Sequence, residues 1–331
     1  MSKLLESLRL RSLLLGNRLV MPPMATAKAE ADGSVSQELI DYYAEKSAGG
    51  YFGLVITEHS YIRPDGRASA KQLSVASEGA VEGLRRLAAA IHRDGSKCAV
   101  QINHAGSMAS EELIGTRPLG PSAVANPRRG GTPRELGRAE MSGLVEAYRD
   151  AARRVKEAGF DAVEIHSAHG YLLNQFLSPL TNRRTDEYGG DLKRRIRLHL
   201  EVLEAVRGAV GEDFPVLLRL GASDFAEGGT TPGDAALASR AFEEAGVDAI
   251  DISGGFSGYD LPGLAGQGYF SPLAEAVKGA VSIPVILTGG ITEAAAAERI
   301  LAAGTADLVG VGRAVLADSS WARRAVGSLR R

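Results

Sequence analysis

Cysteine is almost absent from this chain of 331 residues, which contains only Cys98. A single thiol excludes an internal disulfide framework, and we expect neither a cysteine-ligated zinc site nor a cysteine-ligated iron–sulfur cluster. No metal site is predicted from the sequence. The chain also lacks a signal-peptide pattern and any apolar run of about 18 residues, the length that a membrane-spanning helix needs. We therefore expect a soluble, cytoplasmic protein.

An excess of charge of either sign is also missing, and aromatic residues are scarce. Lysine and arginine number 38 against 40 aspartates and glutamates, which gives a net charge of −2. Without a basic patch, neither nucleic acid nor a membrane surface is an expected partner. Glycine, by contrast, is plentiful at 40 residues, while aromatic residues make up 5%. Many tight turns in a chain of this composition favour a repeating α/β architecture.

Short β-branched runs alternate eight times with longer amphipathic stretches along almost the whole chain. Several stretches end in a glycine that is followed by an aspartate and a new strand, as at Asp161, Asp248 and Asp307, which is typical of loops from helix to strand. The predicted strands are 19–22, 53–57, 97–102, 161–165, 215–220, 249–252, 284–287 and 307–311. The predicted helices are 36–47, 78–93, 140–158, 192–210, 234–245, 271–280 and 293–303.

The strand cores are continuous apolar runs, for example at 216–218 and 285–287. Such runs are typical of parallel strands that are buried on both faces. Eight strand–helix units in about 300 residues match a (β/α)8 TIM barrel. A doubly wound sheet is the second possibility, but it needs a glycine-rich turn after the first strand, and residues 21–25 (MPPMA) offer none. We predict a single α/β barrel domain spanning residues 1–331.

Two insertions interrupt this regular pattern. Residues 104–139 contain four prolines and predict a long excursion after the third strand rather than a helix. Residues 253–270 contain six glycines between the sixth strand and its helix. Long loops in compact domains are commonly lids or binding loops. We expect these two segments to carry substrate selectivity.

Polar side chains gather where the predicted strands end, which is where barrel enzymes carry their catalytic groups. Arg219 ends an otherwise apolar strand, and a buried arginine is rarely tolerated without an anionic partner. It would suit an electron-rich ring whose reduced form is an anion. Gln101 offers both a donor and an acceptor, which fits the imide edge of a flat heterocycle.

Glycines follow the last two strands, where barrels commonly bind phosphate. Gly289 and Gly290 follow the seventh strand, and Gly312 and Arg313 follow the eighth. Glycines let backbone N–H groups approach phosphate oxygens, and arginine can bind them with two hydrogen bonds. These residues predict a phosphate site; the alternative is a pair of tight turns beside a surface arginine.

His166 and His169 are spaced so that both rings could share one face of a helical segment. They could be a metal pair, although no third ligand is evident. They could instead donate to a carbonyl oxygen that gains negative charge, or simply pack around the turn. Tyr171 follows directly, and its phenol could act as a proton donor.

Several ordered motifs resemble the Old Yellow Enzyme family of FMN-dependent ene reductases along nearly the whole chain. The most specific are residues 166–180 (HSAHGYLLNQFLSPL) and 182–190 (NRRTDEYGG). Residues 17–24 (NRLVMPPM), 101–106 (QINHAG), 289–292 (GGIT) and 311–313 (VGR) match as well.

The resemblance implies FMN, bound without a covalent link at the mouth of the barrel and reduced by NADH or NADPH. His166 and His169 would hold the carbonyl oxygen of an α,β-unsaturated substrate. Flavin N5 would deliver a hydride to the β-carbon, and Tyr171 would protonate the α-carbon. The positions that would contact FMN are Pro22, Pro23, Met24, Ala25, His59, Gln101, Arg219, Gly289, Gly290, Gly312 and Arg313.

The chain departs from the family pattern at two positions after the first strand. Ala25 and Ala27 stand where some members carry a redox-tuning cysteine and a substrate-contacting tyrosine. Part of the wider family resembles dienoyl-CoA reductase, with an iron–sulfur site and a further FAD/NAD domain. With one cysteine and an end at Arg331, we expect neither here.

Other functions remain open at this point. FMN could serve nitro reduction, dehydrogenation or amine oxidation. The barrel could also bind flavin or phosphate without catalysis, or act on sugar phosphates without a flavin. As partners the family resemblance suggests a small-molecule substrate of the enone type and further copies of the chain, in a dimer or tetramer.

Overall fold

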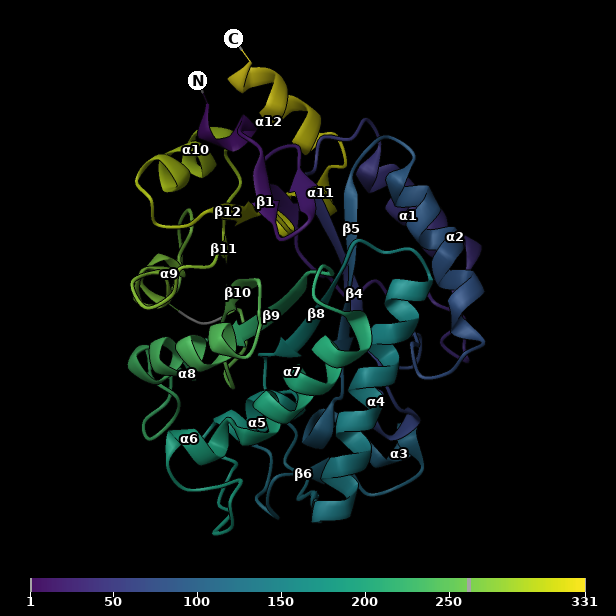
Figure 1. Cartoon of the computed structure of the whole chain (residues 1–331), viewed down its shortest axis with the longest axis vertical. Helices are drawn as coiled ribbons and strands as arrows, with labels where there is room; N and C mark the ends of the chain where they lie inside the picture. Colours follow the sequence, from purple (N-terminus) through teal and green to yellow (C-terminus); the bar gives the residue numbers. More distant parts are fainter. Residues whose placement is uncertain (1, 261–262, 331) are drawn as a thin grey trace.

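The chain forms a closed barrel of eight parallel strands in sequence order, which confirms the predicted (β/α)8 fold (Figure 1). The computed structural model describes residues 2–260 and 263–330. The ends of the predicted domain, residues 1 and 331, and residues 261–262 of the glycine-rich loop lie outside the described residues. The barrel strands are β3 (Leu19–Met21), β4 (Leu54–Tyr61), β5 (Lys97–Asn103), β8 (Ala162–Ser167), β9 (Val216–Gly221), β10 (Ala249–Ser253), β11 (Val285–Thr288) and β12 (Leu308–Gly310).

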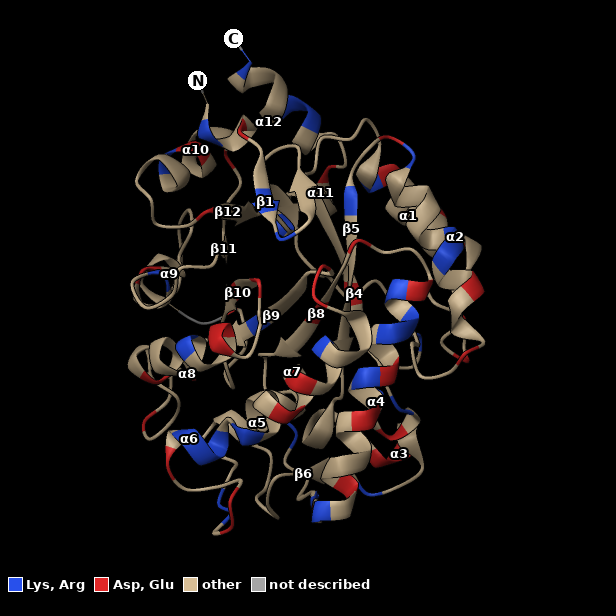
Figure 2. Ribbon diagram, viewed as in Figure 1, with Lys and Arg blue, Asp and Glu red and all other residues tan. Residues whose placement is uncertain are grey.

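Helices surround the barrel and bury their apolar faces against it. In Figure 2 the strands are mostly tan, and the charged residues lie mainly on the helices and loops. The predicted helix over 192–210 is divided at Ile196 into two helices, α6 and α7. The helices around the barrel are α1 (Gln37–Ser47), α2 (Ala80–His92), α4 (Arg138–Glu157), α5 (Leu172–Leu177), α6 (Leu192–Arg195), α7 (Arg197–Val210), α8 (Pro232–Glu244), α9 (Ser271–Lys278), α10 (Ala294–Ala302), α11 (Arg313–Ala317) and α12 (Trp321–Leu329).

An N-terminal hairpin that the sequence did not predict closes one end of the barrel. It consists of β1 (Leu8–Leu10) and β2 (Leu13–Leu15). Its buried leucines Leu10, Leu13 and Leu15 pack into one cluster with side chains from the barrel strands, among them Leu54 at the start of β4. The hairpin therefore covers the amino-terminal end of the barrel and leaves the carboxyl end for the candidate site.

The aspartates of the helix-to-strand loops join neighbouring strands at this same amino-terminal end. Asp161, Asp248 and Asp307 each accept a hydrogen bond from the backbone N–H of a residue at the start of the preceding barrel strand, at 2.8–2.9 Å. The glycine before each of them has a positive φ of 74–94°, as expected for a residue that ends a helix in the left-handed region. The repeated glycine–aspartate pattern is therefore a structural device of the fold.

The excursion over 104–139 contains more regular structure than the sequence predicted. It holds the 3-10 turn η3 (Gly106–Met108), a short helix α3 (Glu111–Ile114), and the two-residue strands β6 (Leu119–Gly120) and β7 (Arg134–Glu135). The prediction of no helix there was wrong for α3. Ser110 caps its first turn, and Gly115 ends it in the left-handed region.

Two further 3-10 turns, η1 (Lys3–Leu5) and η2 (Pro64–Gly66), complete the described elements. Among the described residues, no helix combines the length and the apolar character needed to cross a membrane.

Candidate active site

A cavity of about 980 Å³ opens at the carboxyl ends of the barrel strands. All fourteen residues that the sequence analysis proposed for catalysis or FMN contact line it, and their roles there remain predictions. They are Pro22, Pro23, Met24, Ala25, His59, Gln101, His166, His169, Tyr171, Arg219, Gly289, Gly290, Gly312 and Arg313.

Two histidines and a tyrosine converge on one side of this cavity. The ring of His166, near the end of β8, lies 5.0 Å from the ring of His169 and 5.0 Å from that of Tyr171, centroid to centroid. The segment is a turn, not the helix that would place the two histidines on one face. His169 takes a positive φ of 60°, its backbone oxygen accepts a hydrogen bond from Arg128, and its Nε2 lies 2.7 Å from Ser253 Oγ. The turn, rather than helical spacing, brings the rings together.

Burial sets the protonation state of this cluster. It lowers the pKa of His166 and of His169 well below the usual range, so both rings are neutral at pH 7. A neutral imidazole keeps one N–H donor for a substrate oxygen. The Nδ1 atom of His166 is buried and has no hydrogen-bond partner among the described residues. Burial also raises the pKa of Tyr171, so its phenol keeps its proton.

His59 lies behind Tyr171, with the two rings 5.2 Å apart. Its Nδ1 is 2.9 Å from the side-chain amide nitrogen of Gln72 and 3.3 Å from that of Asn103. These amide groups donate, so Nδ1 accepts and the ring hydrogen lies on Nε2. Burial lowers the pKa of His59 to about 4, which keeps this ring neutral as well.

Two buried acids inside the barrel were missed by the sequence analysis. Arg219 is 5% exposed, and its Nε lies 3.4 Å from Asp251 Oδ2. Gln101 donates a 2.7 Å hydrogen bond to Glu164. Burial raises the pKa of both acids, and the positive charge of Arg219 opposes this. Their signal was an acid inside an apolar strand, in 162–167 (AVEIHS) and 249–253 (AIDIS).

The glycines at the ends of β11 and β12 line the opposite side of the cavity. Gly289 and Gly290 have φ values of 135° and 66°, and the backbone oxygen of Gly289 accepts a 2.7 Å hydrogen bond from the N–H of Gly268. A Cβ atom at Gly290 would lie 2.1 Å from the backbone oxygen of Gly266. The backbone can adopt this arrangement because residue 290 has no side chain.

Both predicted insertions contribute to the cavity wall. The excursion over 104–139 contributes Arg128 and Arg129, and the loop after β10 contributes Tyr259 and Tyr269. Arg313 reaches Tyr269, with a guanidinium nitrogen 3.2 Å from its hydroxyl oxygen. Sequence reasoning placed selectivity in these segments but did not identify the individual residues, because irregular loops have no periodic pattern.

The residues present fit FMN. The cavity is within the size range of cofactor pockets. It combines an apolar wall at Pro22, Pro23 and Met24 with a buried arginine whose Nε lacks a hydrogen bond among the described residues. The glycines at the ends of β11 and β12 leave backbone exposed for a phosphate. Fold and site together define a TIM-barrel oxidoreductase of the flavin type.

The chain belongs to the NADH:flavin oxidoreductase / NADH oxidase family, whose model matches residues 3–330. This is the Old Yellow Enzyme family that the motifs indicated. The cofactor of the family is FMN, with NADH or NADPH as the reductant.

Relatives and one solved structure agree with this family. The chain is 43% identical to an NADH oxidase of Thermoanaerobacter brockii over 96% of its length, but covers 50% of that protein. It is 39% identical to an NADPH dehydrogenase of Clostridium acetobutylicum, covering 95% of this chain and 91% of the relative. An Old Yellow Enzyme homologue of Zymomonas mobilis is 26% identical with a TM-score of 0.85, covering 98% of this chain and 92% of that structure. The chain thus spans about half the length of the first of these relatives and about nine-tenths of the other two proteins.

Proposed function

We propose that this protein reduces the activated C=C bond of α,β-unsaturated carbonyl compounds, with FMN as its cofactor and NADH or NADPH as its reductant. The observation that carries this proposal is the cluster of His166, His169 and Tyr171 on one side of the cavity. Neutral imidazole donors beside a protonated phenol suit a substrate that gains negative charge on oxygen and then needs a proton on carbon.

His166 and His169 would hold the substrate's carbonyl oxygen. Each offers one N–H, and these donors stabilise the charge that grows on oxygen as the β-carbon is reduced. Ser253 and the turn at His169 fix that ring in place, so little reorganisation is needed during the reaction. Tyr171 then supplies a proton to the α-carbon from the same side of the cavity.

When bound, FMN would supply the two-electron hydride chemistry that links the nicotinamide to the substrate. Gln101 and Arg219 would bind the polar edge of the flavin ring, and the guanidinium would favour the reduced, more negative form. Asp251, whose Oδ2 lies 3.4 Å from Arg219 Nε, balances part of the guanidinium charge inside the barrel. Gly289, Gly290, Gly312 and Arg313 would hold the phosphate, while Pro22, Pro23, Met24, Ala25 and His59 would line the ring.

The test is reduction of cyclohexenone by the purified holoenzyme. We expect NAD(P)H to reduce the bound flavin in the absence of enone, and added enone to re-oxidise it without oxygen and to yield the saturated ketone. His169→Ala should weaken the binding of a phenol, which mimics the enolate oxygen, by at least tenfold while retaining FMN. A flavin that NAD(P)H reduces but no enone re-oxidises would refute the proposed substrate class.

A further inference from the structure

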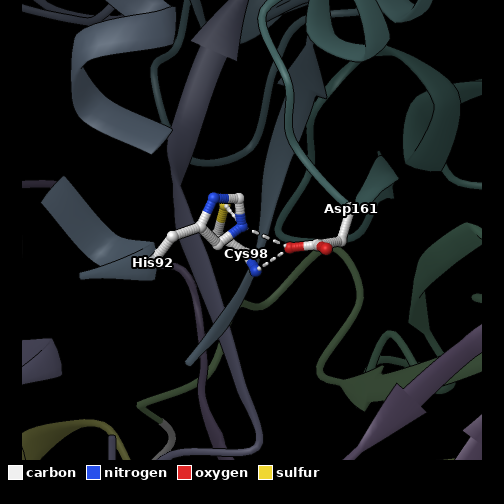
Figure 3. Close-up of side chains that lie close together, drawn as sticks. All are labelled: His92, Cys98 and Asp161. Carbon is white, nitrogen blue, oxygen red and sulfur yellow. Dashed lines mark hydrogen bonds and ion pairs between the residues drawn. The ribbon is translucent and has the colours of Figure 1, made fainter. Parts of the chain in front are cut away.

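Three side chains with metal-binding chemistry lie close together (Figure 3). They belong to the amino-terminal end of the barrel, and none of them lines the cavity. Among the residues that the structure describes, His92, Cys98 and Asp161 form the one group of three His, Cys, Asp or Glu side chains whose ligand atoms lie within 4.8 Å of one another. His92 is the last residue of α2, Cys98 is the second residue of β5, and Asp161 directly precedes β8. The mechanism proposed above uses none of them.

The backbone holds two of these residues in place. Asp161 N–H donates to the backbone oxygen of Cys98 at 2.9 Å, and Cys98 N–H donates to Asp161 Oδ2 at 2.9 Å. The parallel register of β5 and β8 continues this pairing from Ala99 and Ala162 onward. The thiol and the carboxylate are therefore positioned before any ligand arrives.

His92 contacts both Asp161 and Cys98 through the same ring nitrogen. His92 Nε2 lies 2.6 Å from Asp161 Oδ2 and 3.3 Å from Cys98 Sγ. A nucleophilic triad uses the two ring nitrogens separately, one for the acid and one for the thiol. Here the same nitrogen, Nε2, faces both the carboxylate and the thiol, and the three ligand atoms lie within 4.8 Å of one another, close enough to bind a single ion after a small movement.

We propose that His92, Cys98 and Asp161 bind a divalent cation of the zinc type in a four-coordinate site completed by water. Sulfur, imidazole and carboxylate together are the ligands that Zn²⁺ takes, at bond lengths of about 2.0–2.3 Å. Two such ligand atoms in a tetrahedral site lie about 3.5 Å apart. The distance of 3.3 Å between His92 Nε2 and Cys98 Sγ already fits this spacing. His92 Nε2 now lies 2.6 Å from Asp161 Oδ2, and a rotation of the ring that increases this distance by roughly 1 Å would admit the ion.

The surroundings give the ion a way in and define its chemistry. Cys98 is fully buried, whereas the side chain of His92 is 33% exposed, so the ion and its water enter beside the imidazole. Lys97 lies 3.3 Å from the other oxygen, Asp161 Oδ1, so the metal would bind Oδ2, which also accepts the hydrogen bond from Cys98 N–H. Binding converts the thiol to a thiolate, and its proton passes to solvent.

A metal here would join α2, β5 and β8 at the face of a barrel that serves stability rather than catalysis. The expectation of no cysteine-ligated zinc site came from the count of cysteines. One thiolate is enough when an imidazole and a carboxylate complete the set, so that count does not exclude this site.

The test is zinc uptake by the holoenzyme. After removal of metals with a chelator, the protein is incubated with Zn²⁺, desalted, and analysed for bound metal. We expect about one zinc per chain in the wild type and in His169→Ala, which checks for binding in the cavity, and a loss of at least tenfold in Cys98→Ala and His92→Gln. Zinc should also slow modification of Cys98, the single cysteine, by a thiol reagent.

A second measurement does not depend on the variants folding. Co²⁺ bound by a thiolate in a four-coordinate site gives strong ligand-field bands at longer wavelengths than flavin absorption, and we expect these in the wild type. No retained zinc, equal retention by Cys98→Ala, or weak six-coordinate cobalt bands would each overturn the proposal. Zinc retention and the cobalt bands are measured without a substrate, so this test is independent of the proposed enzyme activity. Cyclohexenone reduction by Cys98→Ala should stay unchanged.

Discussion

Tyr171 is buried but lines the cavity, so its proposed role as the general acid can be tested. Burial raises its pKa, so at neutral pH the phenol carries the proton that the reduced substrate needs. We expect Tyr171→Phe to slow re-oxidation of the flavin by enone by about 10²-fold, the usual scale for loss of a general acid. Reduction of the flavin by NADPH should change less than twofold, because that step needs no proton from the phenol.

Stopped-flow absorbance of the two half-reactions separates these effects. Equal slowing of both would indicate that Tyr171 supports the shape of the cavity and is not the acid.

At the scale of single residues, the sequence identified His166, His169, Tyr171 and Arg219 because ionisable side chains at strand ends are conspicuous. It missed Asp251, because one acid in an apolar run shows no partner until the barrel closes.

At the scale of elements, the loop after β11 depends on a glycine that accepts both a positive φ and a close backbone contact. In Gly290→Ala the Cβ would press on the backbone oxygen of Gly266, and both residues line the cavity. We expect FMN to bind at least tenfold more weakly, measured by titrating the flavin-free protein and following flavin fluorescence.

Gly304→Ala is the matched control, because Gly304 has a similar φ of 74° but open space around its Cβ. It should suffer the same backbone strain, of about 1 kcal/mol, and bind FMN as the wild type does. Equal loss of affinity in both variants would attribute the effect to general destabilisation.

Strand and helix positions were predictable where short apolar runs alternate with longer amphipathic stretches, as along the eight strands of the barrel. The hairpin of β1 and β2 was not, because its two short strands lie outside the repeating strand–helix pattern by which the equally short β3 and β12 were recognised. The break at Ile196 was also invisible, since the apolar spacing continues through α6 and α7.

At the scale of the whole molecule, the barrel has one end for its cavity and one end closed by the hairpin. Leu15 is fully buried in the cluster that fills the barrel, whereas its neighbour Leu14 is 50% exposed. Leu15→Ala should lower the free energy of unfolding by about 2–5 kcal/mol, through lost burial and an unfilled cavity.

Leu14→Ala should change it by less than about 0.5 kcal/mol, and urea unfolding followed by circular dichroism compares the two. FMN affinity should be unchanged in both variants, because the cavity lies at the opposite end of the barrel. A similar cost at both positions would mean that the hairpin does not close the barrel as a core element.

Local sequence patterns were sufficient to predict the barrel, the order of its strands and the residues at its carboxyl end. These follow from local patterns: apolar runs, glycine–aspartate loops, and polar groups where strands end. The folded barrel was needed to show which of those groups meet. It shows that a turn with positive φ orients His169, that Asp251 lies beside Arg219, and that His92 lies beside Cys98. Such contacts join residues far apart or across a turn, and their geometry is fixed only when the barrel closes and its strands take their register.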